Sequence, residues 1–505
     1  MALRRQRWSS GIVREFGSQA LVKIKYGVSR IPESKKGRKQ KMTDLSNYYQ
    51  RDPRDSKPIP SERFPENHVK FSGLLKPLEW IDRVYGLFGS RAFTGKKAIL
   101  AEFDSAAPLD KYLGTEGELR KARMVVVSYC DGADNNPFLS SIGRFLGRRL
   151  ALDILKNRKK VLQYYHSNRE FIEAHGKLKA PVIITGVPRS GTTLLQRLMS
   201  EDPNTRAPYT FELEIATPPM TSGANPLEDP RIKESGAAVT TLSRLAPGFL
   251  EKFAESHLWI ATEMEEPFLY MLHHNGMFAM NIASAGRVYI DDFFKIEDKR
   301  PVFRYERLFL TMLDAYRPAK SHWTLKSASY APYFPMIFEE YPDVRVVVTH
   351  RNPLVTLPSY CRLMESWCIP FDQNGSFDKY RFGQFQKVFI EKCLMVPLNY
   401  RKEHPEKEEQ IFDCMYEELF SNPIAMVKTI YRKFGLEYTE EFEERMKVYL
   451  ENNKQGKYGR HKYSLEEYGF KKESIYQEYK DYMEQYDFGI PDKIERPVSF
   501  DFSLG

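Results

Sequence analysis

The chain has 505 residues, of which 42% are apolar, and it carries a formal net charge of +9 at pH 7. This length is sufficient for one large domain with an extension, or for two domains. The first 41 residues hold most of the excess positive charge, so the remainder is close to neutral and the overall charge does not indicate nucleic-acid binding.

Hydropathy and cysteine content argue against a membrane-spanning protein and against a protein with a cysteine-ligated metal. No stretch approaches the roughly 20 consecutive apolar residues that a membrane-spanning helix requires. The five cysteines are odd in number and lack the spacing of metal ligands, which favours a reducing, intracellular compartment. We therefore expect a cytoplasmic protein without a transmembrane segment or a bound metal. A mitochondrial location is the alternative, because the N-terminus is arginine-rich and poor in acidic residues.

The N-terminal part of the chain divides into an arm and a helical region. Residues 1–60 contain KKGRKQK and RDPRDSKPIP and lack a periodic apolar pattern, which predicts a flexible or extended basic arm. Residues 61–150 contain short helical patterns such as PLEWIDRVYGLFG, so we expect a mostly helical extension. Residues 137–175 carry a longer helical pattern ahead of the first predicted strand.

The most informative stretch is residues 180–202, APVIITGVPRSGTTLLQRLMSED. An apolar run ends at Gly186, a short loop follows, and an amphipathic helical pattern begins at Thr192. A strand, a tight loop and a helix in this order present backbone N–H groups at a helix N-terminus, which is a natural site for a phosphate.

This loop differs from the P-loop of nucleoside triphosphatases at a decisive position. The spacing from Gly186 to Gly191 is that of G-x-x-x-x-G-K-[ST], but Thr192 stands where that motif has lysine. The loop keeps a cation at Arg189 instead. We therefore expect it to bind a phosphate without the usual arrangement for the outer phosphates of ATP or for magnesium.

The region after the loop helix is predicted to cover the site. Prolines interrupt the helical pattern in RAPYTFELEIATPP, residues 206–219. Residues from about 221 to 320 are helical in pattern, rich in aromatic residues and without a strand pattern. An insertion at this place in a P-loop fold lies over the C-terminal ends of the strands and forms the acceptor pocket.

The remainder repeats an alternation of strands and helices. Strands are predicted at residues 323–326, 344–349 and 411–415. Asn352 and Pro353 are typical of a helix start directly after Arg351, and Gly435 is typical of a helix end. The pattern predicts an α/β fold, with a P-loop-like parallel sheet flanked by helices, a helical insertion over the active site and a mostly helical N-terminal extension.

The segment PRSGTTLL resembles the 5′-phosphosulfate-binding loop of sulfotransferases, which use 3′-phosphoadenosine 5′-phosphosulfate (PAPS) as donor. WTLKSASY is similar to the family segment W-x-L-K-S-P-x-H, with Tyr330 in the place of the frequent histidine. YEELFSNP followed by FGL, and KYGRHKYSLEEYGF, are similar to segments of a soluble branch that is distinct from the usual cytosolic and the Golgi carbohydrate sulfotransferases. The resemblance covers residues from about 180 to 479 and implies a sulfotransferase domain over 151–505.

The resemblance also implies the residues that bind the donor. The family holds the 3′-phosphate with an arginine and a serine eight positions apart, which are Arg351 and Ser359 here. The C-terminal R-K-G loop of cytosolic members is missing, and Lys457 and Arg460 are candidates to replace it. The 5′-phosphosulfate would be bound by the loop residues Arg189, Ser190, Gly191, Thr192 and Thr193.

The implied reaction is an in-line, metal-free transfer of a sulfuryl group to a hydroxyl or amine of a small or medium-sized acceptor. Arg189 and the loop would stabilise the charge that grows on the leaving oxygen, and Lys326 could reach the sulfonate. The first candidate for the general base is Glu212, which corresponds to the family segment W-E after the loop helix. Weaker candidates for the base are His257, Glu265, Glu266 and His350.

Two alternatives remain. A P-loop kinase or NTPase is disfavoured by Thr192 and by the sequence Thr349–Arg351, which stands where a magnesium-binding aspartate would follow the strand. A non-catalytic scaffold with a nucleotide pocket is the second alternative, because the N-terminal extension is long. Assays of ATP and PAPS binding, and of sulfate transfer, distinguish these possibilities.

Overall fold

The computed structural model describes residues 73, 76–87, 95–135, 139–235, 260–267, 299–368, 379–453 and 463–490. The chain divides into two units, Met1–Ser56 and Lys57–Gly505, and all the described residues lie in the second. The predicted basic arm and much of the predicted insertion therefore fall outside the described residues. The predicted domain boundaries stay predictions, and the one at residue 150 falls inside a helix, α5 (Ser141–Ser167).

The centre of the unit is a parallel sheet of four strands in the order β2-β1-β3-β4. The strands are β1 (Val182–Gly186), β2 (Thr324–Lys326), β3 (Arg345–His350) and β4 (Ile411–Met415). These agree with the strands expected from the sequence to within a residue at each end, and the predicted α/β fold is confirmed. Since all four strands run in the same direction, their C-terminal ends meet at one edge of the sheet.

The two faces of the sheet belong to two separate apolar cores, as the alternation of side chains along a strand requires. Ile183 and Val346 face one core, whereas Ile184 and Val347 face the other. All four are fully buried, and burial of each such side chain contributes about 1.5–3 kcal/mol. Helices must cover both faces, because a parallel sheet buried on both sides needs two apolar partners.

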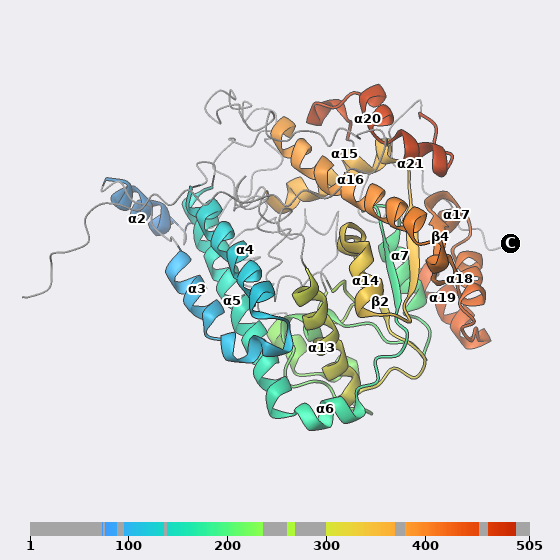
Figure 1. Cartoon of the computed structure of the whole chain (residues 1–505), viewed down its shortest axis with the longest axis horizontal. Coiled ribbons are helices and arrows are strands. Elements are labelled where there is room, and N and C mark those ends of the chain that lie inside the picture. The colour runs from blue at the N-terminus through green and yellow to red at the C-terminus, as the bar shows by residue number, and fades with distance from the viewer. Residues whose placement is uncertain are drawn as a thin grey trace, which may run out of the picture. The chain divides into compact units, whose positions relative to one another are not determined.

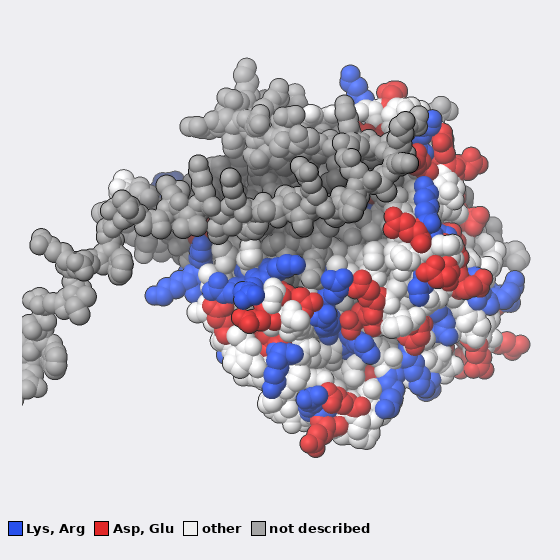
Figure 2. Space-filling model, in the orientation of Figure 1, with Lys and Arg blue, Asp and Glu red and all other residues white. Residues whose placement is uncertain are grey.

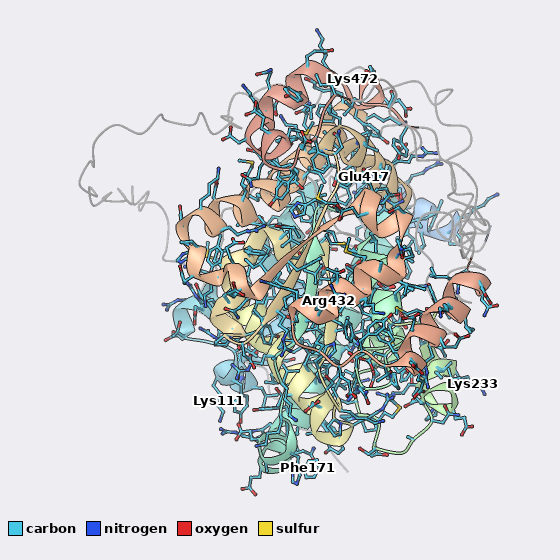
Figure 3. The ribbon with its side chains drawn as sticks, turned by 90° about the vertical axis from the view of Figure 1, so that its right-hand side faces the viewer. Lys111, Phe171, Lys233, Glu417, Arg432 and Lys472 are labelled. Atoms are coloured by element: carbon cyan, nitrogen blue, oxygen red, sulfur yellow. The ribbon has the colours of Figure 1, made fainter. Side chains whose placement is uncertain are left out.

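One face is covered by the loop helix and by helices from the C-terminal part of the chain. They are α7 (Thr192–Met199), α17 (Tyr416–Ser421), α18 (Pro423–Lys433) and α19 (Glu440–Asn452). Figure 3 looks onto this group, with Glu417 on α17 and Arg432 on α18. The predicted helix end is confirmed, because Gly435 adopts a φ of 62° just after α18.

The opposite face is covered by helices from the middle of the chain, and the last two described helices pack beside them. The former are α13 (Arg300–Tyr316), α14 (Phe334–Glu340), α15 (Pro353–Cys368) and α16 (Lys379–Glu403), and the latter are α20 (Lys472–Glu478) and α21 (Lys480–Gln485). The predicted start of α15 is confirmed, since the Asn352 side chain accepts a 3.0 Å hydrogen bond from the N–H of Leu354.

The N-terminal extension is helical, as expected, and packs against α13. Its helices are α2 (Lys76–Leu87), α3 (Lys96–Asp104), α4 (Glu116–Asn135) and α5, followed by α6 (Arg169–His175). In Figure 1, α3, α4 and α5 lie side by side, and α4, α5 and α6 all contact α13. The fully buried Arg158 of α5 pairs with Asp110, which fastens α5 to the short 3-10 helix η4 (Ala107–Tyr112).

Short helical turns complete the described part. They are α8 (Thr210–Glu214) and the 3-10 helices η5 (Pro226–Glu228), η6 (Ala328–Tyr333), η8 (Pro405–Gln410) and η9 (Glu466–Tyr468). Over the described ranges, no helix combines the length and the apolar character needed to cross a membrane. Figure 2 shows basic and acidic side chains interspersed over the visible face of the described part.

Candidate active site

The loop between β1 and α7 has a backbone that depends on two glycines. Gly186 adopts a φ of 128°, and a Cβ there would lie 2.3 Å from the carbonyl oxygen of Thr349. Gly191 adopts a φ of 88°, and a Cβ there would lie 2.9 Å from the Leu419 side chain. Only glycine fits these positions, because they combine left-handed backbone with close neighbours. The sequence motif is therefore a requirement of the loop's geometry.

Arg189 lies at the tip of this loop in a conformation that is unusual for its residue type. Its φ is 68°, in the left-handed region that residues with a Cβ seldom adopt. Such strain is concentrated in proteins at sites where the surrounding structure and a function require it. The guanidinium Nε lies 3.4 Å from Oγ of Ser359 on α15, the helix that follows β3. The cation of the loop therefore lies beside that helix.

The two threonines after the loop form the first turn of α7. The N–H groups of a first helical turn have no partner within their helix, and they carry the positive end of the helix dipole. Thr192 is buried, whereas Thr193 is exposed at this terminus. Ser190 is buried, and its Oγ bonds to the Val187 carbonyl and lies 2.6 Å from Oγ1 of Thr349. The Ser190 hydroxyl thus ties the loop to β3.

The pair Arg351 and Ser359, which the resemblance implied as a phosphate site, lies beside the loop. Arg351 directly follows β3, and its Nη1 donates a 2.7 Å hydrogen bond to the carbonyl oxygen of Arg189. Its guanidinium lies 4.0 Å from the centroid of the Tyr416 ring, at the start of α17. Because parallel strands end at one edge, Arg189, Arg351 and Ser359 meet here although more than 160 residues separate the first from the other two.

Lys326 occupies the C-terminal end of β2, on the other side of the loop. Its Nζ lies 3.4 Å from Oγ1 of Thr193, 3.5 Å from Oε2 of Glu266 and 3.9 Å from Oε1 of Glu265. The side chain is only 3% exposed, so the ammonium is held in place by these three neighbours. The register of β1 and β2 explains the position, since Lys326 pairs with Ile184, two residues before the end of β1.

Glu212 lies on α8, and its carboxylate is bonded to two other groups of the protein. Its carboxylate is fully buried and accepts a 2.7 Å bond from Nη2 of Arg206 and a 3.1 Å bond from the N–H of Tyr209. Arg206 is buried as well and stacks 4.5 Å from the centroid of the Trp323 ring. The contacts of Glu212 in the described part are thus with a buried arginine and a helix start, and its role as base stays a prediction.

His350, a weaker candidate for the base, has both of its ring nitrogens in contact with other side chains. Its Nδ1 lies 2.9 Å from the Tyr482 hydroxyl and its Nε2 lies 2.8 Å from Oδ1 of Asp413. Burial lowers the pKa of His350, which keeps the ring neutral. Burial opposes the ionisation of Asp413, but hydrogen bonds from His350 and Arg401 outweigh it and lower the pKa of Asp413 to about 2.

Three predicted site residues cannot be compared with the structure, and two contacts were not anticipated. Lys457, Arg460 and His257 lie outside the described residues. The sequence reasoning missed Tyr416 as the ring behind Arg351, although the segment YEELFSNP that contains it had been singled out. It also missed Thr349, whose hydroxyl holds Ser190, because a threonine in a buried strand carries no signal of its own.

Across the described ranges, no cluster of three or more His, Cys, Asp or Glu side chains is arranged to hold a metal.

Comparisons with known proteins identify the family and the fold. The model of the sulfotransferase family matches residues 181–440, which include the loop, Lys326, Arg351 and Ser359. The structure is similar to that of sulfotransferase STF9 from Mycobacterium avium, with a TM-score of 0.67 and 21% identity over 78% of this chain and 97% of the other. It is also similar to sulfotransferase STF1 from Mycobacterium tuberculosis H37Rv, with a TM-score of 0.62 and 22% identity over 75% and 97%. No curated protein sequence matches the chain significantly.

Proposed function

The chain belongs to the sulfotransferase family, and from this premise we propose that it transfers a sulfuryl group from PAPS to a hydroxyl or amine of a small or medium-sized acceptor. The observation that carries the proposal is the meeting of Arg189, Arg351 and Ser359 at the C-terminal edge of the sheet. PAPS has two anionic ends, and a protein that binds it needs two cationic sites on one surface. The loop with Arg189 supplies one, and Arg351 with Ser359 supplies the other.

The donor's 5′-phosphosulfate would lie over the N-terminus of α7. The backbone N–H groups of residues 190–193 and the hydroxyls of Thr192 and Thr193 would donate to its oxygens, as helix N-termini do to anions. The donor's 3′-phosphate would bind Arg351 and Ser359 through charge-assisted hydrogen bonds. Lys457 and Arg460 remain proposed as additional cations for this phosphate.

Catalysis would consist of positioning and of charge stabilisation. The acceptor oxygen attacks sulfur in line, an S–O bond forms, and the bond from sulfur to the bridging phosphate oxygen breaks. The leaving 5′-phosphate takes the negative charge, which Arg189 and the loop N–H groups would stabilise. Lys326 would neutralise the sulfonate oxygens during transfer, because its ammonium lies next to Thr193 at the same helix terminus. No step in this scheme requires a metal.

The proposal is tested by binding first and by transfer second. Isothermal titration calorimetry measures the dissociation constants of adenosine 3′,5′-bisphosphate, adenosine 5′-phosphate and ATP with magnesium. We expect the bisphosphate to bind most tightly. Transfer of labelled sulfate from PAPS is then screened against phenols, alcohols and amines. Tight ATP binding with no affinity for the bisphosphate would favour a kinase or NTPase, whereas bisphosphate binding without any transfer would favour a non-catalytic scaffold.

A further inference from the structure

Residues 260–267, here called the strap, lie against α8 and the segment before it and are fixed to them by backbone hydrogen bonds. The N–H of Phe211 donates to the Ala261 carbonyl at 3.1 Å, and the N–H of Thr210 donates to the Glu263 carbonyl at 2.9 Å. In the other direction, the N–H of Glu265 donates to the Pro208 carbonyl at 3.0 Å. The backbone from Ala261 to Glu265, which leads directly to Glu266, is therefore held against α8 and the segment before it.

The strap is also tied to α7, the helix that carries the donor loop. Gln196 on α7 donates from Nε2 to the Glu265 carbonyl at 3.4 Å, and Arg197 pairs with Glu263 at 3.3 Å. Lys326 completes the connection, because its ammonium contacts both Thr193 and Glu266. One cation thus links the exposed start of α7 with a carboxylate on the strap.

The candidate bases Glu212, Glu265 and Glu266 differ in how far their carboxylates are open to an acceptor. The Glu212 side chain is 0% exposed, with both oxygens bonded to Arg206 and Tyr209. The Glu265 side chain is 5% exposed, and its Oε1 accepts a 2.8 Å bond from the N–H of Glu266. The Glu266 side chain is 26% exposed while its Oε2 faces Lys326. Of the three, Glu266 combines access with proximity to the proposed sulfonate site.

From this geometry we propose that Glu266 is the general base for the acceptor, an inference that rests on the proposed sulfuryl transfer. As the acceptor oxygen forms its bond to sulfur, the acceptor's proton passes to the Glu266 carboxylate. The S–O bond to the leaving phosphate breaks and the electron pair leaves with adenosine 3′,5′-bisphosphate. Glu266 then returns its proton to water. The Lys326 ammonium orients the Glu266 carboxylate and also binds the sulfonate of the donor. The base and the sulfur atom therefore lie next to the same cation.

The test compares three single variants of the whole chain, Glu266→Gln, Glu212→Gln and Glu263→Gln. The third is the matched control, since Glu263 lies on the same strap but pairs with Arg197 instead of Lys326. Turnover is measured with PAPS and a series of phenols from unsubstituted phenol to 4-nitrophenol. If no phenol is accepted, release of adenosine 3′,5′-bisphosphate by transfer to water is measured instead. Titration with the bisphosphate gives donor-site affinity for each variant.

We expect Glu266→Gln to lower turnover by ~10²-fold or more, a typical loss for a general base, with the nucleotide affinity changed less than twofold. The loss should shrink with 4-nitrophenol, which releases its proton readily, and the acid limb of the pH–rate profile should disappear. Glu263→Gln should resemble the wild type. Wild-type turnover in Glu266→Gln, an equal loss with every phenol, or a base-like loss in Glu212→Gln alone would overturn the assignment. If the wild-type protein binds the bisphosphate but never turns over PAPS, the proposed function itself fails.

Discussion

The guanidinium of Arg351 donates a 2.7 Å hydrogen bond to the carbonyl oxygen of Arg189. The residue proposed to hold one end of the donor thus also supports the backbone of the residue proposed to hold the other end. Arg189 has a φ of 68°, so this hydrogen bond supports a backbone in the left-handed region that residues with a Cβ seldom adopt. The two proposed anion sites are therefore connected through this hydrogen bond, and a substitution in either should also alter the other.

The first prediction concerns selectivity for the 3′-phosphate. Arg351→Ala and Ser359→Ala should weaken binding of adenosine 3′,5′-bisphosphate much more than binding of adenosine 5′-phosphate, because the second ligand lacks the group they hold. Arg351→Lys keeps the charge but loses the planar fork, so it should recover only part of the affinity. Titration calorimetry with both nucleotides measures this. Equal weakening of the two nucleotides would contradict the assignment.

The second prediction separates the charge of Arg189 from its backbone conformation. Arg189→Ala and Arg189→Gly should both lower turnover by ~10²–10³-fold, a typical loss for one stabilising donor. The glycine variant should be the more stable of the two by about 1 kcal/mol, since only glycine adopts a positive φ without a steric cost. Urea unfolding of the two variants measures the difference. Wild-type turnover in either one would exclude Arg189 from catalysis.

The third prediction concerns the buried pair of Glu212 and Arg206, which are 0% and 4% exposed. Glu212→Gln removes the charge that compensates a buried guanidinium, so the free energy of unfolding should fall by roughly 3–5 kcal/mol. Replacing the exposed Glu116, which pairs with Arg120 on α4, is the control and should change stability by less than about 1 kcal/mol. A Glu212→Gln protein as stable as the wild type, with turnover lost, would restore Glu212 as the base.

The fourth prediction is a pH dependence of stability that comes from Glu306 on α13. This carboxyl is buried and bonded to the hydroxyls of Tyr330 and Tyr341, and burial raises its pKa to about 8. The folded protein then binds a proton that the unfolded chain loses above about pH 4.5, so this contribution is complete at low pH and is lost as pH rises toward 8. Glu306→Gln should flatten the decline in unfolding free energy between pH 5 and pH 8, measured by urea titration. An unchanged slope would mean that other groups cause it.

The fifth prediction concerns metal ions. Sulfate transfer from PAPS should persist in EDTA, because the proposed stabilising groups are arginine, lysine and backbone N–H groups. Turnover before and after chelation, with readdition of magnesium as the control, measures this. An absolute requirement for magnesium would instead support the kinase alternative.

Much of the proposed donor site could be predicted from the sequence because its signals are local. Gly186 and Gly191 are required by backbone angles within one loop, and the helix start at Thr192 follows directly. The register of strand and helix then places Arg351 at the end of β3 and Ser359 on the following helix. Parallel strands end at one edge of the sheet, but the meeting of these distant residues also requires β1 and β3 to be neighbours, which the structure shows.

The acceptor side was decided by the tertiary structure. Glu212 was the first candidate for the base because of its place after the loop helix, yet its burial depends on Arg206 and on the Trp323 ring of another segment. Lys326 and Glu266 are 60 positions apart, and their contact exists only because the strap is fixed across α7 and α8. A glycine's backbone angles are a property of its own residue, whereas the exposure and charge partners of a carboxylate are set by whatever the fold packs around it.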